Sequence, residues 1–267
     1  MRLSPRTSDR ITRIAGFVTV TLAAAFLLAP VLLTAVLSFS NDPYFGVPPD
    51  TWGFRQYETL FTDQTWRGAL MLSLKIALPV GLLSAVIAVP AVFAIHRSRL
   101  PGRNVLHVGG LAGIIIPISA FAVAMYGVLA DFGLLGTYAG LVLANTVLAL
   151  PLMLVVTSAA LSRIPVELEL AAMVTGASRA RAWFGITLRL LAPAMIGGFV
   201  LAVVTSFDEA VFINFIGGPG LTTLPKAILD SARLGVDPVI MAVATLLMVA
   251  TSILMILALK FARSTDE

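Results

Sequence analysis

Residues 161–193 read LSRIPVELELAAMVTGASRARAWFGITLRLLAP and interrupt a chain that is otherwise almost entirely apolar. This stretch, called the insert from here on, carries several arginines and lies between two apolar runs long enough to cross a membrane. A protein that is merely anchored in a membrane has no need of an organised polar segment between two spans. The insert therefore predicts a docking surface for a partner.

The composition of the whole chain is that of a polytopic membrane protein. The 267 residues are 58% hydrophobic and 12% charged, whereas a soluble domain carries about 25% charged residues. The pI is near 9.8, but the basic residues gather at the ends of apolar runs, which argues against a nucleic-acid partner. The chain has no Cys, so it offers no disulfide, thiol nucleophile or thiolate metal site.

Six apolar stretches are long enough to cross a hydrocarbon core of about 30 Å. A backbone in lipid must satisfy its own hydrogen bonds, so each stretch predicts a helix. We therefore expect an all-α fold with one transmembrane domain over residues 1–267, surrounded by membrane lipid. The expected spans are Ile14–Phe39, Ala69–Ile95, Val105–Phe132, Tyr138–Leu161, Pro193–Ile216 and Pro238–Phe261, and the loop Ser162–Ala192 joins the fourth span to the fifth.

The basic residues predict the orientation, because Lys and Arg near span ends favour the cytoplasmic side. Most of the 18 Lys and Arg residues fall on one side of the expected spans. Both termini and the insert are therefore expected in the cytoplasm. The residues on that side are Arg2, Arg6, Arg10, Arg13, Arg97, Arg99, Arg103, Arg163, Arg179, Arg181, Arg189, Lys260 and Arg263.

Several kinds of chemistry are missing from the sequence. There is no GxxxxGK[ST] loop to hold ATP phosphates. His96 and His107 are the only histidines, and they form neither a metal site nor a credible catalytic triad. We expect no enzyme activity, no metal and no cofactor in this chain. Transport would then draw its energy from an ion gradient or from a separate subunit.

Within the insert, residues 166–174 have helical periodicity, with Leu168, Ala171, Ala172 and Thr175 on one face. Gly176 is placed to end this helix, and a second short helix is expected over Ala180–Leu191. These features alone suit either an interfacial amphipathic linker or a docking element.

The insert resembles the cytoplasmic loop of ABC importer permeases, whose pattern is Glu-Ala-Ala, three residues, Gly, nine residues, Ile-x-Leu-Pro. The positions that match this pattern are Ala171, Ala172, Gly176, Ile186 and Leu188. Leu170 stands where the family has Glu, with Glu169 one residue earlier, and Arg189 stands where the family has Pro.

Two further stretches resemble the permeases of spermidine/putrescine importers in particular. One is LSFSNDPYFGVPP at residues 37–49, followed by W-G-F-x-x-Y-x-x-L-F, and the other is SFDEAVFINFIGGPGLTTLP at residues 206–225. Permeases for ferric iron, sulfate or aminophosphonates share parts of these patterns and remain alternatives.

The resemblance implies a permease subunit of an ABC importer in the bacterial inner membrane that moves polyamines into the cytoplasm. It implies ABC ATPase subunits that bind ATP, an extracytoplasmic solute-binding protein and a second permease subunit, either different from this chain or identical to it. The residues that it assigns to contact with the ATPase are Glu169, Ala171, Ala172, Gly176, Ile186 and Leu188.

Polar groups within the apolar spans are candidates for contact with the solute. Asp208 and Glu209 lie in the fifth apolar stretch, where carboxylates are costly and usually functional. Pairing with Lys75, Lys226 or Arg233 is the structural alternative. Asn145 suits either the passage or a helix-to-helix hydrogen bond. An ion-coupled secondary transporter is the other functional class, but it is expected to show an inverted repeat, and none is evident.

Overall fold

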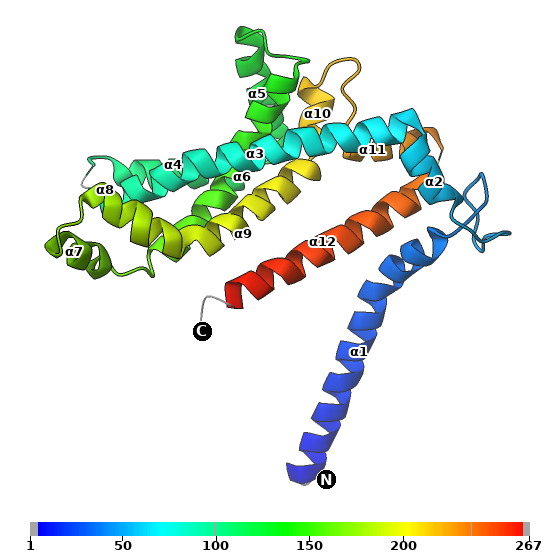
Figure 1. Cartoon of the computed structure of the whole chain (residues 1–267). Helices are drawn as coiled ribbons and strands as arrows, with labels where there is room; N and C mark the ends of the chain where they lie inside the picture. The colour runs from blue at the N-terminus through cyan, green and yellow to red at the C-terminus, as the bar shows by residue number, and fades with distance from the viewer. Residues whose placement is uncertain (1–4, 99, 236, 264–267) are drawn as a thin grey trace. The chain divides into compact units, whose positions relative to one another are not determined.

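The computed structural model describes residues 5–98, 100–235 and 237–263 (Figure 1). Within these residues, four helices are long and apolar enough to cross a membrane, or five if one bent pair forms a single span. The described part of the chain consists of helices joined by turns and loops, with no strand and one isolated β-bridge between Ser40 and Trp52. This is an all-α membrane protein, and six spans remain a prediction. The two termini, whose side of the membrane was predicted, lie outside the described residues.

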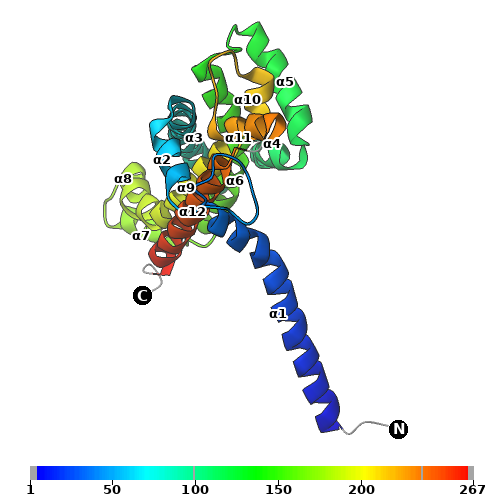
Figure 2. The same cartoon turned by 90° about the vertical axis from the view of Figure 1, so that its right-hand side faces the viewer.

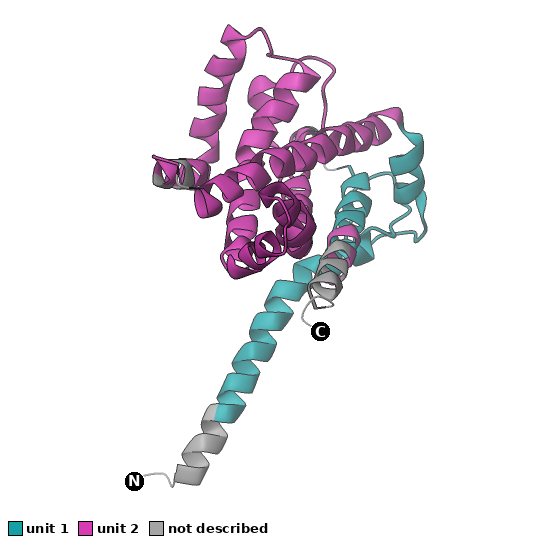
Figure 3. Cartoon of the chain, turned by 60° about the vertical axis from the view of Figure 1, so that its left-hand side comes forward, with its two compact units in different colours: residues 1–63, 234–249 teal, residues 64–233, 250–267 magenta. Residues whose placement is uncertain are grey.

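The chain divides into two compact units (Figure 3). Unit 1 comprises residues 1–63 and 234–249, and unit 2 comprises residues 64–233 and 250–267. The helices of unit 1 are α1 (Pro5–Leu37), α2 (Arg55–Thr62) and the first part of α12 (Val239–Arg263). Those of unit 2 are α3 (Gln64–Arg97), α4 (Arg103–Ile115), α5 (Ile118–Asp131), α6 (Tyr138–Leu161), α7 (Glu167–Val174), α8 (Arg179–Ala182), the π-helical turn η1 (Trp183–Thr187), α9 (Leu188–Phe207), α10 (Val211–Ile216) and most of α11 (Leu224–Leu234).

Four of the expected spans fall on single helices. The stretch Tyr138–Leu161 coincides with α6, and the other three fall on α1, α3 and α12 with boundaries that differ by up to nine residues. α3 is longer than expected and keeps Pro79 and Pro90 in its interior. Neighbouring helices and local adjustments of the backbone allow proline inside membrane helices.

The expectation of one helix over Val105–Phe132 is wrong. α4 ends at Ile115 and α5 begins at Ile118, and the two helices are bent by 117° relative to one another. Pro117 causes the break, because a residue that precedes proline avoids the α conformation. Ile116 accordingly has an extended backbone with ψ of 129°.

The helix bounds expected for the fifth span, Pro193–Ile216, and the separate short helix expected before it also differ from the structure. α8, η1 and α9 form one continuous helix from Arg179 to Phe207, and Pro193 lies inside it. This helix ends at Phe207, and α10 begins where the Glu209 carboxylate accepts hydrogen bonds from the N–H groups of Val211 and Phe212. The first N–H groups of a helix have no partner within it, and the Glu209 carboxylate supplies acceptors for those of α10.

The core of unit 2 is built from α3, α6 and α9, which run alongside one another in Figures 1 and 2. Glycines permit the close approach of these helices. A Cβ atom on Gly81 of α3 would lie 2.6 Å from a methyl carbon of Val203 in α9, and one on Gly198 would lie 2.3 Å from the sulfur of Met153 in α6.

Hydroxyl groups inside the apolar helices bond to their own backbone. Thr146 and Thr157 of α6 donate to the carbonyls of Val142 and Met153, at 2.7 and 2.6 Å. Such bonds satisfy a buried hydroxyl without a partner from another helix. Polar residues in these spans are therefore not, by their presence alone, signs of a passage.

In unit 1, the loop between α1 and α2 is organised around Asp42. Its carboxylate accepts hydrogen bonds from the Thr51 hydroxyl at 2.6 Å and from the N–H groups of Asp50 and Thr51. The Thr51 hydroxyl bond is the main cause that lowers the pKa of Asp42 from its ordinary value, against a smaller opposing effect of burial. Rings of Phe39, Phe54 and Tyr57 pack together beside it, with centroids 5.6–6.2 Å apart.

The packing at Gly81 predicts that alanine at this position destabilises the fold, whereas alanine at Gly68 of the same helix does not. We expect Gly81→Ala to lower the free energy of unfolding by about 1–3 kcal/mol, because the stiff Val203 side chain must move to accept the methyl group. Gly68→Ala is the control, since a Cβ there meets nothing within 4 Å and alanine favours a helix by about 1 kcal/mol. Chemical denaturation of both variants in detergent measures the difference, and equal stabilities would contradict the packing account.

Candidate functional site

The insert folds as a short helix, a tight turn and the start of a long helix. α7 (Glu167–Val174) agrees with the helix expected from the periodicity. Gly176 ends it with φ of +96°, a conformation that glycine adopts without strain. The N–H groups of Gly176 and Ala177 bond to the carbonyls of Met173 and Ala172, at 3.0 Å each. These bonds satisfy carbonyl groups at the end of α7.

One side of α7 presents apolar side chains to the exterior of the chain. Leu168, Leu170 and Val174 are 42%, 50% and 88% exposed. Ala171 is also exposed, and Ala172 is half-buried. Clustered apolar side chains on the surface of a polar segment indicate a site of interaction with another protein or with lipid.

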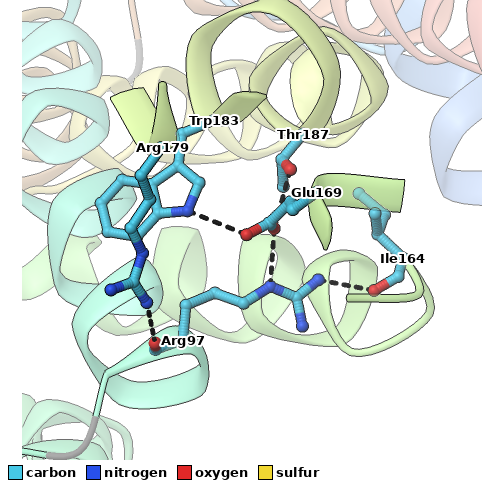
Figure 4. Close-up of polar contacts among 6 residues, drawn as sticks. All are labelled: Arg97, Ile164, Glu169, Arg179, Trp183 and Thr187. Atoms are coloured by element: carbon cyan, nitrogen blue, oxygen red, sulfur yellow. Dashed lines mark hydrogen bonds and ion pairs between the residues drawn. The ribbon is translucent and has the colours of Figure 1, made fainter. Parts of the chain in front are cut away.

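The opposite side of α7 is held by the buried carboxylate of Glu169 (Figure 4). Glu169 is 3% exposed and forms an ion pair of 2.9 Å with Nε of Arg97, the last residue of α3. The same carboxylate accepts hydrogen bonds from Trp183 Nε1 and from the Thr187 hydroxyl, both at 2.8 Å. A buried charge is tolerated when it is paired and its other lone pairs are bonded, and Glu169 meets both conditions.

Arg97 and Arg179 extend this network to the backbone around it. Arg97 donates from Nη2 to the carbonyl of Ile164, at 2.6 Å, in the turn between α6 and α7. The Arg179 guanidinium lies 5.2 Å from the centre of the Trp183 ring and donates to the carbonyl of Arg97 at 3.4 Å. The start of the long helix, α7 and the end of α3 are thereby joined around one carboxylate (Figure 4).

The π-helical turn η1 (Trp183–Thr187) contributes two of the three donors to Glu169. Widened turns of this kind are rare and often lie at functional sites. Two residues of the ABC-permease pattern lie in and just after this turn. Ile186 is half-buried, and Leu188 packs against the core cluster that contains Met153 and Leu191. Leu188 therefore lies against the chain's own core, whereas α7 offers an exposed face.

The three candidates for contact with the solute have different surroundings. Glu209 is buried and its carboxylate bonds to the N–H groups that begin α10, whereas Asp208 is exposed. No ion pair joins either residue to Lys75, Lys226 or Arg233, all of which are described. The Asn145 amide donates to Leu141 of its own helix at 2.9 Å, and its buried oxygen has no hydrogen-bond partner.

Most of the residues that hold Glu169 were not predicted from the sequence. Arg97 was used only to predict the orientation in the membrane, and nothing in the sequence near Trp183 and Thr187 indicated that they bond to Glu169. A carboxylate on the inner side of a short helix was a clue that a cation must lie near it. The partner itself is 72 positions away in the chain, so no local pattern identifies it.

Residues 77–263 match the family described as the binding-protein-dependent transport system inner membrane component. The chain belongs to this family. It is therefore a permease component of an ABC importer rather than an ion-coupled secondary transporter, and ATP hydrolysis in such systems resides in a separate subunit.

Curated relatives cover most of the chain. The putrescine transport system permease protein PotI of Escherichia coli (strain K12) is 32% identical, over 87% of this chain and 85% of that protein. The spermidine/putrescine transport system permease protein PotC of Haemophilus influenzae is 27% identical, over 91% and 94%. The sulfoquinovosyl glycerol transport system permease protein SmoH of Agrobacterium fabrum is 30% identical, over 78% and 76%.

A solved structure supports the same fold. A chain of a bacterial ABC transporter involved in the import of the acidic polysaccharide alginate superimposes with a TM-score of 0.72 at 17% identity, covering 97% of this chain and 99% of that one. At this level of identity the likeness concerns the fold alone.

The buried ion pair predicts a large effect of truncation at Glu169. We expect Glu169→Ala to lower the free energy of unfolding by about 3–5 kcal/mol, because it leaves the Arg97 charge without its partner. Glu167→Ala is the matched control, since Glu167 is exposed on the same helix and changes of this kind cost about 0.5 kcal/mol or less. Denaturation of the purified variants tests this, and equal losses would show that the pair does not hold the insert.

Proposed function

We propose that this chain is one of two transmembrane subunits of an importer that carries polyamines into the cytoplasm. The observation that supports the solute is the similarity to PotI, whose name assigns it to putrescine transport and which matches over most of both chains. The two stretches that resemble spermidine/putrescine permeases, residues 37–49 and 206–225, support the same class.

The proposed complex contains two ATPase subunits, a second permease subunit and an extracytoplasmic solute-binding protein. The insert faces the ATPase, so both termini lie in the cytoplasm. The concentration of arginines near the insert and at the end of α3 supports this orientation. The chain crosses the membrane six times, with the bent pair α4 and α5 as one crossing and α12 as the last.

The exposed apolar face of α7 is the surface that enters the ATPase. Leu168, Leu170 and Val174 supply the contact, and the small side chain of Ala171 permits close approach. Glu169 points the other way and positions α7 without touching the ATPase. Displacement of α7 then passes through Glu169 to α3 and to the helix Arg179–Phe207, both of which belong to the core of unit 2. ATP shifts the permease between states only through such differential contacts.

Of the two neighbouring carboxylates, Asp208 is the one that meets a cationic solute. Its side chain is exposed, whereas the oxygens of Glu209 are already bonded to the backbone of α10. A cation passing Asp208 gains electrostatic stabilisation that is larger in a passage with few waters than in bulk solvent. Asn145, with its unpartnered buried oxygen, is a second candidate deeper in the core.

The turn at Gly176 is expected to be essential for coupling. Gly176→Val forces a β-branched residue to adopt φ of +96°, which reorients the chain that leaves α7. We expect uptake to fall at least tenfold while the protein remains inserted in the membrane. The control is Gly68→Val, since a Cβ there meets nothing within 4 Å, the backbone has no positive φ, and Gly68 lies outside the insert. Uptake by Gly176→Val at the level of the control would contradict the role of α7.

The solute is tested by uptake of radiolabelled putrescine into cells that carry the complete transporter. We expect uptake that depends on this chain, is competed by spermidine and falls several-fold in Asp208→Asn, because the cation loses a charged contact. Asp131→Asn, which removes an exposed carboxylate at the end of α5, is expected to leave uptake unchanged. Uptake of ferric iron, sulfate, an aminophosphonate or sulfoquinovosyl glycerol in place of putrescine would overturn the solute while leaving the permease role intact.

A further inference from the structure

An apolar groove and a basic pocket adjoin one another at the arginine-rich end of α3. The groove has a volume of about 360 Å³, and its walls include Val89, Pro90 and Phe93 of α3 together with Phe184 and Leu188 of the long helix. The basic pocket has a volume of about 440 Å³ and is lined by Arg97, Ser98, Arg179 and Trp183. Ser98 and Trp183 line both spaces, so the groove opens into the basic pocket.

The groove is apolar, as the acyl chains of a lipid are, and the pocket is polar and basic, which suits an anionic headgroup. Val89 and Phe93 lie in the apolar part of α3, one of the helices fit to cross a membrane, while Arg97 ends that helix. The groove therefore lies at the level of hydrocarbon, and the pocket lies where headgroups begin. Phe184, which lines the groove, is 72% exposed.

The pocket carries positive charge that the chain itself does not neutralise. The charge of Arg97 is compensated by Glu169. Arg179 rests on the Trp183 ring and donates to the carbonyl of Arg97. Arg103 donates at 3.4 Å to the carbonyl of Ser98, a residue that lines both spaces. Among the described residues, neither Arg179 nor Arg103 has a carboxylate within ion-pair distance. Two uncompensated guanidinium groups at the mouth of an apolar groove favour an anion with a hydrocarbon tail.

We propose that this site binds an anionic phospholipid. Its phosphate lies between Arg179 and Arg103, and one acyl chain lies in the groove between α3 and the long helix. Arginine suits this role because its planar donors match phosphate oxygens. Since Arg179 also contacts the Arg97 carbonyl, a bound lipid reinforces the part of the chain that holds Glu169 and α7. The lipid composition of the membrane then affects how firmly the insert is held.

Native mass spectrometry of the assembled transporter, with phosphatidylglycerol and phosphatidylcholine in competition, tests the site. We expect phosphatidylglycerol to be retained preferentially, and Arg179→Gln to reduce its retention at least fivefold. Arg181→Gln removes the same charge two residues away, from a side chain that does not line the pocket, and is expected to change nothing. Arg179→Lys is expected to restore part of the binding.

A second variant tests the groove without altering charge. Ala94→Phe fills the groove and is expected to reduce retention of phosphatidylglycerol as strongly as Arg179→Gln does. If Arg179→Gln does not fold, Ala94→Phe and Arg103→Gln decide the question. Equal retention of the two lipids, equal losses in Arg179→Gln and Arg181→Gln, or no retention of phosphatidylglycerol by the assembled transporter would each overturn the proposal.

Discussion

The buried carboxylate of Glu169 needs partners, and the arrangement of the insert follows from how those partners are supplied. A carboxylate removed from water costs several kcal/mol unless it is paired and bonded. Arg97, Trp183 and Thr187 meet that need from the end of α3 and from one π-helical turn. α7 therefore cannot move away from α3 and the helix Arg179–Phe207 without breaking this ion pair and both hydrogen bonds. The short surface helix α7 is therefore held to two helices of the core.

The same network separates the two sides of α7. The side with Glu169 is committed to the chain itself, while Leu168, Leu170 and Val174 remain exposed. Any partner that binds the exposed side would act on a helix whose other side is bonded to α3 and to the helix Arg179–Phe207. The glycines between α3, α6 and α9 place those helices in close contact, and closely packed interiors transmit displacement rather than absorb it.

Much of the fold was predictable because it depends on local properties. The helix over α6, the short helix of the insert and the turn at Gly176 follow from apolar run length, periodicity and the backbone freedom of glycine. The failures also have local causes. The bend of 117° at Ile116–Pro117 and the early end of α9 at Phe207 were overlooked because apolar composition continues through both breaks. Apolar composition indicates that a segment lies in lipid, but it does not indicate whether the helix is continuous.

The sequence by itself determined the class of protein, since run length, charge placement and the spacing of Ala171, Ala172 and Gly176 depend on neighbours along the chain. Only the tertiary structure decided what the polar residues do. Glu169, read as a contact for the ATPase, faces its own chain, and Glu209, read as a contact for the solute, begins a helix. The reason is physical, because the free-energy cost of a buried carboxylate depends on the donors that folding brings within about 3 Å of it. For Glu169 one of those donors is Arg97, which lies 72 residues away in the sequence.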